Sequence, residues 1–163
     1  VFLDLQLTGL QGNVMKESMN VAKTLAWNLT DKETKQKWLS EFQETKCQGL
    51  HIHCPEGGIS KDGPSAGAAI TCAIYSLLSK KPIKNDIAIT GEINLSGEIT
   101  AIGGLASKLT GGIRAGIKTF LYPQANQRDL NKWKNQNRYP ESVSFVCVTH
   151  INDVLENIFA CST

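Results

Sequence analysis

Segments with strand-like and helix-like apolar spacing alternate along this chain, and that alternation restricts the fold more than any other feature. Short apolar runs typical of strands occupy residues 2–7, 50–54, 87–90, 118–122 and 143–148. Between them, apolar residues recur every three or four positions over 14–25, 66–80, 104–115 and 151–158, as in helices packed on one side. Alternating strands and helices within 163 residues predict a single mixed α/β domain over 1–163.

Three further segments complete the predicted organisation. Residues 31–46 carry many charges around a narrow apolar stripe, which predicts a surface helix with Asp31 as its N-cap. Residues 93–99 predict a hairpin that turns at Ser96-Gly97. Residues 124–140 are polar, and we expect an irregular loop there.

Charge and cysteine content exclude several classes of protein. Seventeen Lys and Arg against fifteen Asp and Glu leave a net charge of +2, too small to predict a nucleic-acid or membrane partner. No apolar run approaches the roughly 20 residues of a membrane span. An odd count of five cysteines and the absence of an N-terminal signal favour a reducing, intracellular compartment. Cys72 and Cys147 fall on predicted core elements, and we expect both to be inert.

A glycine-rich loop before a helix is the first candidate for chemistry. Gly57, Gly58 and Gly63 are followed by Pro64 and Ser65, which we place in the first helical turn. Free N–H groups at a helix N-terminus can stabilise an oxyanion, as acyl transfer requires. The simpler, purely structural interpretation is that Ser65 only caps the helix.

A serine nucleophile needs a base, and two candidates remain open. Lys108 falls in an apolar stripe with Leu105, Leu109 and Gly112, so we expect it to be partly buried, which disfavours the ammonium form. Alternatively, the Lys108 side chain could extend along the surface and keep its charged nitrogen in water. The pattern G-x-S-x-G around Ser65 also permits an esterase triad of Ser65, Asp129 and His150, although the serine does not directly follow a strand.

Other side chains allow weaker hypotheses. His51 and His53 should face the same side of a strand and could hold zinc with Cys47 or Glu56, although a structural or substrate-lining role is favoured over a metal. A cysteine–histidine peptidase built on Cys54 is a further alternative. Residues 127–140 interleave cations with Trp133 and Tyr139, a pattern that could bind RNA, but the small net charge favours a solvated loop.

Several motifs, taken in order, resemble the proteolytic domain of the Lon protease family. The similarity runs from about residue 8 to residue 130 and continues more weakly to 159. The motifs are Thr8-Gly9-Leu10-Gln11-Gly12-Asn13-Val14-Met15-Lys16-Glu17-Ser18, His51-Ile52-His53-Cys54-Pro55-Glu56-Gly57, Lys61-Asp62-Gly63-Pro64-Ser65-Ala66-Gly67, Thr90-Gly91-Glu92, Ile102-Gly103-Gly104-Leu105 with Lys108, Arg114-Ala115-Gly116-Ile117-Lys118, and Pro123.

The resemblance implies a serine endopeptidase with a Ser-Lys dyad and a fold similar to the second domain of ribosomal protein S5. Ser65 falls on the nucleophile, Lys108 on the general base, and Thr90 on a threonine that hydrogen-bonds the lysine. Asp62 and Gly63 fall beside the nucleophile in supporting positions. The residues His51, His53 and Glu56 fall in the strand and loop before the serine, where they would line the substrate site.

The chain departs from the family pattern at two places beside the dyad. Ala106-Ser107 stands where the family commonly has Lys-Glu, and Ser60 stands where it commonly has proline. Neither position is on the dyad itself. We expect the departures to affect substrate fit and loop conformation more than the reaction.

The resemblance also implies a larger assembly. Lon proteases carry an ATPase module, and this chain has no phosphate-binding G-x-x-x-x-G-K-[ST] loop, so we expect ATP and Mg²⁺ to bind only that module. We expect the domain to be part of a longer ATP-dependent protease that forms hexamers and degrades unfolded or misfolded proteins. The expected compartment is the cytoplasm or the mitochondrial matrix.

Overall fold

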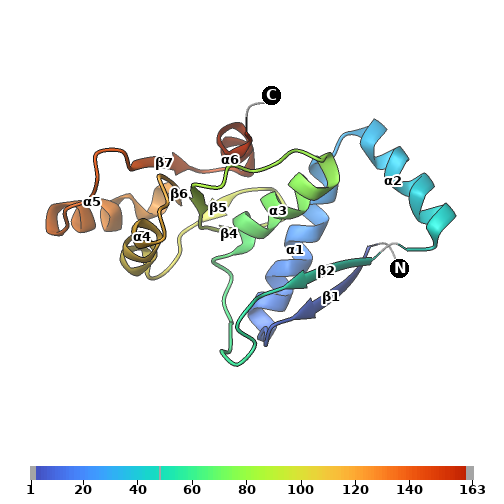
Figure 1. The fold of residues 1–163 in the computed structure, drawn as a ribbon, viewed down its shortest axis with the longest axis horizontal. Helices are drawn as coiled ribbons and strands as arrows, with labels where there is room; N and C mark the ends of the chain where they lie inside the picture. The colour runs from blue at the N-terminus through green and yellow to red at the C-terminus, as the bar shows by residue number, and fades with distance from the viewer. Residues whose placement is uncertain (1–2, 48, 161–163) are drawn as a thin grey trace.

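The computed structural model describes residues 3–47 and 49–160. Phe2, placed in the first predicted strand, and Cys161 lie outside the described residues. The molecule is elongated, with paired strands and a protruding helix at one end and a sheet flanked by helices at the other (Figure 1). The strands and helices alternate as the sequence predicts, so the mixed α/β class is confirmed.

The N-terminal end is a parallel strand pair packed beside two helices. Strand β1 (Asp4–Thr8) pairs in parallel with β2 (Gly49–His53), Asp4 opposite Gly49 and Thr8 opposite His53. Two helices connect the strands, because parallel strands need a crossover; they are α1 (Asn13–Leu29) and α2 (Lys32–Thr45). Helix α3 (Gly67–Ser79) lies against α1 (Figure 1).

The other end is a parallel sheet with strand order β3-β6-β7. Helix α4 lies between β3 and β6 in the chain, and α5 lies between β6 and β7. The hairpin β4–β5 turns through Gly97 as expected, and α6 closes the described chain. The bounds are β3 Ile87–Ile89, β4 Glu92–Ile93, β5 Ile99–Thr100, α4 Leu105–Arg114, β6 Thr119–Pro123, η1 Gln124–Asn126, α5 Gln127–Gln136, β7 Ser144–Val148 and α6 Ile151–Ile158.

The expected irregular loop at 124–140 is wrong, because most of it is helical. A short 3₁₀ turn leads into α5, whose Leu130 and Trp133 are almost fully buried. Two apolar side chains three residues apart are enough to fix one face of a helix when both reach a core. Trp133 stacks on Tyr139 at 5.5 Å between ring centroids, and Tyr139 meets Phe145 edge-on.

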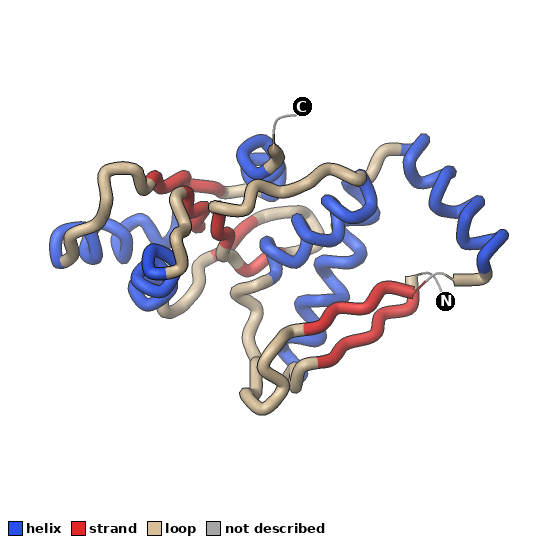
Figure 2. The backbone as a smooth tube through the Cα atoms, viewed as in Figure 1, coloured by secondary structure: helices blue, strands red, loops and turns tan. Residues whose placement is uncertain are grey.

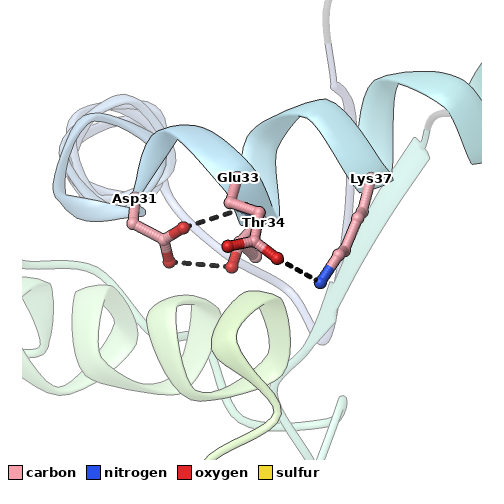
Figure 3. A network of polar contacts seen from close by, with 4 residues as sticks. All are labelled: Asp31, Glu33, Thr34 and Lys37. Carbon is pink, nitrogen blue, oxygen red and sulfur yellow. Dashed lines mark hydrogen bonds and ion pairs between the residues drawn. The ribbon is translucent and has the colours of Figure 1, made fainter.

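Helix α2 is the surface helix that the charge pattern predicts, with none of its residues buried. Asp31 caps it by accepting hydrogen bonds from the Thr34 N–H at 2.9 Å and the Thr34 hydroxyl at 2.7 Å, and Lys37 pairs with Glu33 at 2.7 Å (Figure 3). The bond from the Thr34 backbone N–H, followed by that from its hydroxyl, lowers the pKa of the Asp31 carboxyl. The Trp38 indole N–H donates to the Leu78 carbonyl at 2.8 Å and fastens α2 to α3.

The core consists of three buried clusters. The central one joins α1, α3, α6 and the sheet, and it contains Cys72, whose thiol pKa burial raises to about 12. A second cluster joins α4, β6 and α5, and a third lies between α1, β2 and α3. The expected core position of Cys72 is confirmed. Cys147 is exposed instead, because it lies on the edge strand β7 and points away from the core that its neighbour Val148 enters.

Candidate active site

Ser65 lies just before helix α3. The sequence-based placement of Ser65 in the first turn of this helix is therefore wrong. Ala66 is the N-cap and Gly67 the first helical residue, while the Gly67 N–H closes a turn onto the Pro64 carbonyl at 3.0 Å. The Ser65 carbonyl accepts hydrogen bonds from the Gly91 N–H at 3.0 Å and the Thr90 hydroxyl at 3.3 Å. The serine is therefore held from the segment between β3 and β4.

Lys108 reaches Ser65 from helix α4. Its Nζ lies 3.2 Å from the Ser65 Oγ, within hydrogen-bond distance, although 43 positions separate the two residues in sequence. Leu105 and Leu109, on the same face of α4, are almost fully buried and fix the helix against the core. The two residues that the sequence proposes as a dyad are thus brought together.

The expected partial burial of Lys108 is wrong, because its side chain is exposed. Leu105 and Leu109 fill the inward face of α4, which leaves Lys108 at the edge of the stripe. A long lysine side chain can follow that edge and hold its nitrogen in water. In the free chain, water therefore solvates the amine beside Ser65.

Thr90 shares the site but does not make the expected hydrogen bond to Lys108. Its hydroxyl donates to the Ser65 carbonyl, and within the described residues it has no bond to the lysine nitrogen. A threonine hydroxyl has one proton to donate, and here that proton goes to the backbone of the serine. Thr90 therefore positions the main chain of Ser65.

An apolar cavity of about 200 Å³ opens between α3, α4 and the sheet. Ser65, Thr90 and Lys108 are the polar residues along its walls, apart from Tyr122, whose hydroxyl donates to the Gln127 side chain. Burial raises the pKa of the Tyr122 phenol. The remaining walls are apolar: Ala66, Ala69, Ala88, Ile89, Leu105, Leu109, Phe120 and Leu121. The spacing of the sequence does not reveal this set, because it is assembled from four separate elements.

Asp62 and Gly63 lie in the loop before Ser65. An oxygen of Asp62 accepts the Met15 N–H at 2.9 Å in the first turn of α1, so this carboxylate anchors the loop away from the dyad. Gly63 has φ +137°, a backbone conformation that side chains rarely adopt. Within residues 3–47 and 49–160, no hydrogen bond occupies the N–H of Gly63 or of Ser65, so both can face an oxyanion.

The three residues expected to line the substrate site do not line this cavity. His51 and His53 do share one side of β2, since His51 Nε2 and His53 Nδ1 lie 2.9 and 2.8 Å from the Thr8 Oγ1. Neither histidine nor Glu56 is among the residues that line the cavity. In the described part of the chain, no group of three or more His, Cys, Asp or Glu residues could hold a metal.

The alternative sites suggested by the sequence are not assembled. His150 caps α6 and its Nε2 lies 3.0 Å from the Ser96 carbonyl, while Asp129 accepts from the Asn126 amide, so neither pairs with Ser65. Trp133 is buried against Tyr139 and offers no open face to a base. No helix in the described ranges is long and apolar enough to cross a membrane.

Comparison with known proteins identifies the family of this chain. Residues 3–161 match the family model of the Lon protease (S16) C-terminal proteolytic domain. The Lon protease of Desulfatibacillum aliphaticivorans is 42% identical over 154 residues, which cover 94% of this chain and 18% of that protein. Lon protease 2 of Herpetosiphon aurantiacus is 40% identical over 153 residues, with the same coverage of both chains. The Lon protease of Vibrio parahaemolyticus is 46% identical over 125 residues, which cover 77% of this chain and 15% of that protein.

The match covers nearly the whole chain but only a minor part of each relative. The chain spans about a fifth of the length of the curated relatives, and what it shares with them is the proteolytic region. Ser65 with its loop, Lys108 on α4 and the β3-β6-β7 sheet all lie inside the matched residues. This chain belongs to the family of Lon protease C-terminal proteolytic domains.

Proposed function

We propose that this domain cleaves peptide bonds with Ser65 as nucleophile and Lys108 as general base. The single observation that carries the proposal is the 3.2 Å separation of the Lys108 Nζ and the Ser65 Oγ at the wall of an apolar cavity. A nucleophilic hydroxyl needs a base within hydrogen-bond reach, and this separation is at the upper end of that range. Membership of a protease family gives independent support.

The reaction proceeds in two steps. In the first, the Ser65 Oγ attacks the peptide carbonyl carbon while the neutral Lys108 amine accepts the hydroxyl proton and then delivers it to the departing amine. In the second, water attacks the resulting ester and frees Ser65. The N–H groups of Gly63 and Ser65 donate to the oxyanion that forms in each step.

The exposure of Lys108 gives the substrate a part in the mechanism. A bound peptide whose apolar side chain fills the cavity covers the amine and removes the water around it. Peptides that fill the cavity are therefore cleaved faster than peptides that leave it open.

The proposal is tested by covalent labelling. A serine-directed acylating inhibitor should modify Ser65, identified by mass spectrometry, and Ser65→Ala should lose both labelling and cleavage of an unfolded protein. Ser40→Ala, on the exposed face of α2, is the matched control and should behave as wild type. Cleavage by Ser65→Ala at the wild-type rate would remove the serine from the mechanism.

The role of the whole protein is also a proposal. We infer that a longer, hexameric Lon-type protease delivers unfolded or misfolded proteins to this domain in the cytoplasm or the mitochondrial matrix, with no nucleic-acid or membrane partner. ATP and Mg²⁺ are assigned to its ATPase module and no cofactor to this chain. The likeness to proteins named Lon protease supports this assignment, as does the absence of a phosphate-binding loop from the sequence.

A further inference from the structure

The loop that carries Ser65 has little hydrophobic support. Residues 54–66 leave the β1–β2 pair and cross to α3 as irregular backbone (Figure 2). Residues 55–60 are all exposed, and the Ile59 side chain is 59% exposed. Glu56 has φ +61°, which is unfavourable for a residue with a side chain. Some other interaction must hold this loop in one conformation.

Lys61 supplies that interaction through three backbone carbonyls. Its Nζ donates to the carbonyl oxygens of Glu56 at 2.8 Å, Ile59 at 3.0 Å and Gly9 at 3.4 Å. An ammonium group has three protons and no acceptor site, so each proton has a carbonyl partner. Within the described residues Lys61 has no carboxylate partner. Its half-buried side chain thus closes the loop on itself and ties it to the turn after β1.

The backbone of the same residues continues the attachment toward Ser65. The Lys61 N–H donates to the Leu10 carbonyl at 3.0 Å, and the Lys61 carbonyl accepts the Gly12 N–H at 2.7 Å. Asp62 then accepts the Met15 N–H. Gly9 permits the close approach, because a Cβ on it would lie 1.9 Å from the Cys54 carbonyl oxygen. The attached stretch ends three residues before the nucleophile.

We propose that Lys61 is a positioning residue for catalysis. Its ammonium fills the cage of Gly9, Glu56 and Ile59 carbonyls, and this holds the 54–66 loop so that Ser65 stays within reach of Lys108 and the Gly63 N–H faces the oxyanion. The inference rests on the proposed role of Ser65. It assigns Lys61 no contact with substrate, so its loss affects turnover more than binding.

The first test removes the charge and keeps the shape. Lys61→Met should lower kcat about ten- to hundredfold, the range expected for one charged hydrogen-bonding group, with KM changed less than about threefold. Hydrogen exchange should quicken at the Ile59, Lys61 and Gly12 amides, which donate within the attached region. Lys118→Met, at an exposed lysine outside the site, is the control and should change neither.

The second test refills the cage. Lys61→Ala removes three carbons and the nitrogen, which are the heavy atoms of propylammonium. Added propylammonium should therefore restore part of the kcat of this variant. Tetramethylammonium at equal ionic strength cannot donate hydrogen bonds and should restore none. Unchanged kcat in Lys61→Met, a change in KM alone, or lost kcat with unaltered exchange at these amides would each overturn the proposal. Failure of the proposed function would be seen separately, because Ser65→Ala would then still cleave. The hydrogen-exchange measurement tests the cage and does not depend on catalytic activity.

Discussion

Ser65 and Lys108 reach one cavity from regions that are stabilised in opposite ways. The lysine stands on α4, whose Leu105 and Leu109 are 3% and 1% exposed and pack among Phe120, Leu130 and Trp133. The serine follows an exposed loop held by hydrogen bonds to backbone atoms and by Asp62. Packing makes the position of Lys108, the proposed base, part of the global fold, whereas Ser65, the proposed nucleophile, can be displaced locally.

The largest effect should follow from substituting the base. Lys108→Arg and Lys108→Ala should each lower cleavage by about 10²–10⁴-fold, because a guanidinium stays protonated and a methyl group has no lone pair. Both should fold, since the side chain is exposed. Steady-state cleavage of an unfolded protein and circular dichroism measure the two quantities. Full activity in Lys108→Arg would show that the rigid side of the site holds no base.

A smaller effect should separate the two regions directly. Leu109→Ala, in the packed region, should lower the free energy of unfolding by about 2–5 kcal/mol. Ile59→Ala, in the exposed loop, should change it by less than about 0.5 kcal/mol, because the side chain is already 59% exposed. Urea unfolding followed by circular dichroism compares the two. Equal losses would mean that the loop belongs to the same cooperative core.

The smallest effect lies outside both regions and provides a baseline. Asp153, in the first turn of α6, accepts hydrogen bonds from the backbone N–H groups of Thr149 and His150, which precede the helix. These bonds lower the pKa of the Asp153 carboxyl below the usual 3.8. A lowered pKa in the folded state means that the carboxylate stabilises the fold above about pH 4 and that this contribution is lost as the pH falls below it. Asp153→Asn should therefore cost roughly 1 kcal/mol at pH 7 and progressively less below pH 4.

Thermal unfolding of wild type and Asp153→Asn, at pH 7 and below pH 4, measures this difference in stability. Glu156→Gln, an exposed carboxylate on the same helix, serves as the control and should leave the curves unchanged. A cost for Asp153→Asn that grows toward acid pH would contradict the assigned direction of the pKa shift. Catalysis per folded molecule should be unaffected, because no residue of α6 lines the cavity that Ser65 and Lys108 share.

The same contrast explains how far the sequence could be interpreted. Helices α1, α3, α4 and α6 have apolar stripes, and stripes are visible in sequence, so these elements were predicted correctly. Helix α5 was missed because only Leu130 and Trp133 mark its buried face. The motifs identified Ser65 and Lys108, but spacing could not show that Lys108 is exposed or that Thr90 donates to the Ser65 carbonyl. The proposed role of Lys61 depends on contacts with backbone carbonyl oxygens, which every residue carries, so the motif that contains Lys61 does not reveal these contacts.

The burial of Trp133 has a spectroscopic consequence. The sequence has three tryptophans, and Trp27 and Trp38 both pack in the cluster of α1, β2 and α3. Trp133 alone reports on the region that carries Lys108, where it stacks on Tyr139. A variant with phenylalanine at positions 27 and 38 would therefore emit from that region only. Its emission maximum should shift to the red when α4 and α5 separate from the sheet, and an optical signal would then follow the base side independently of the serine loop.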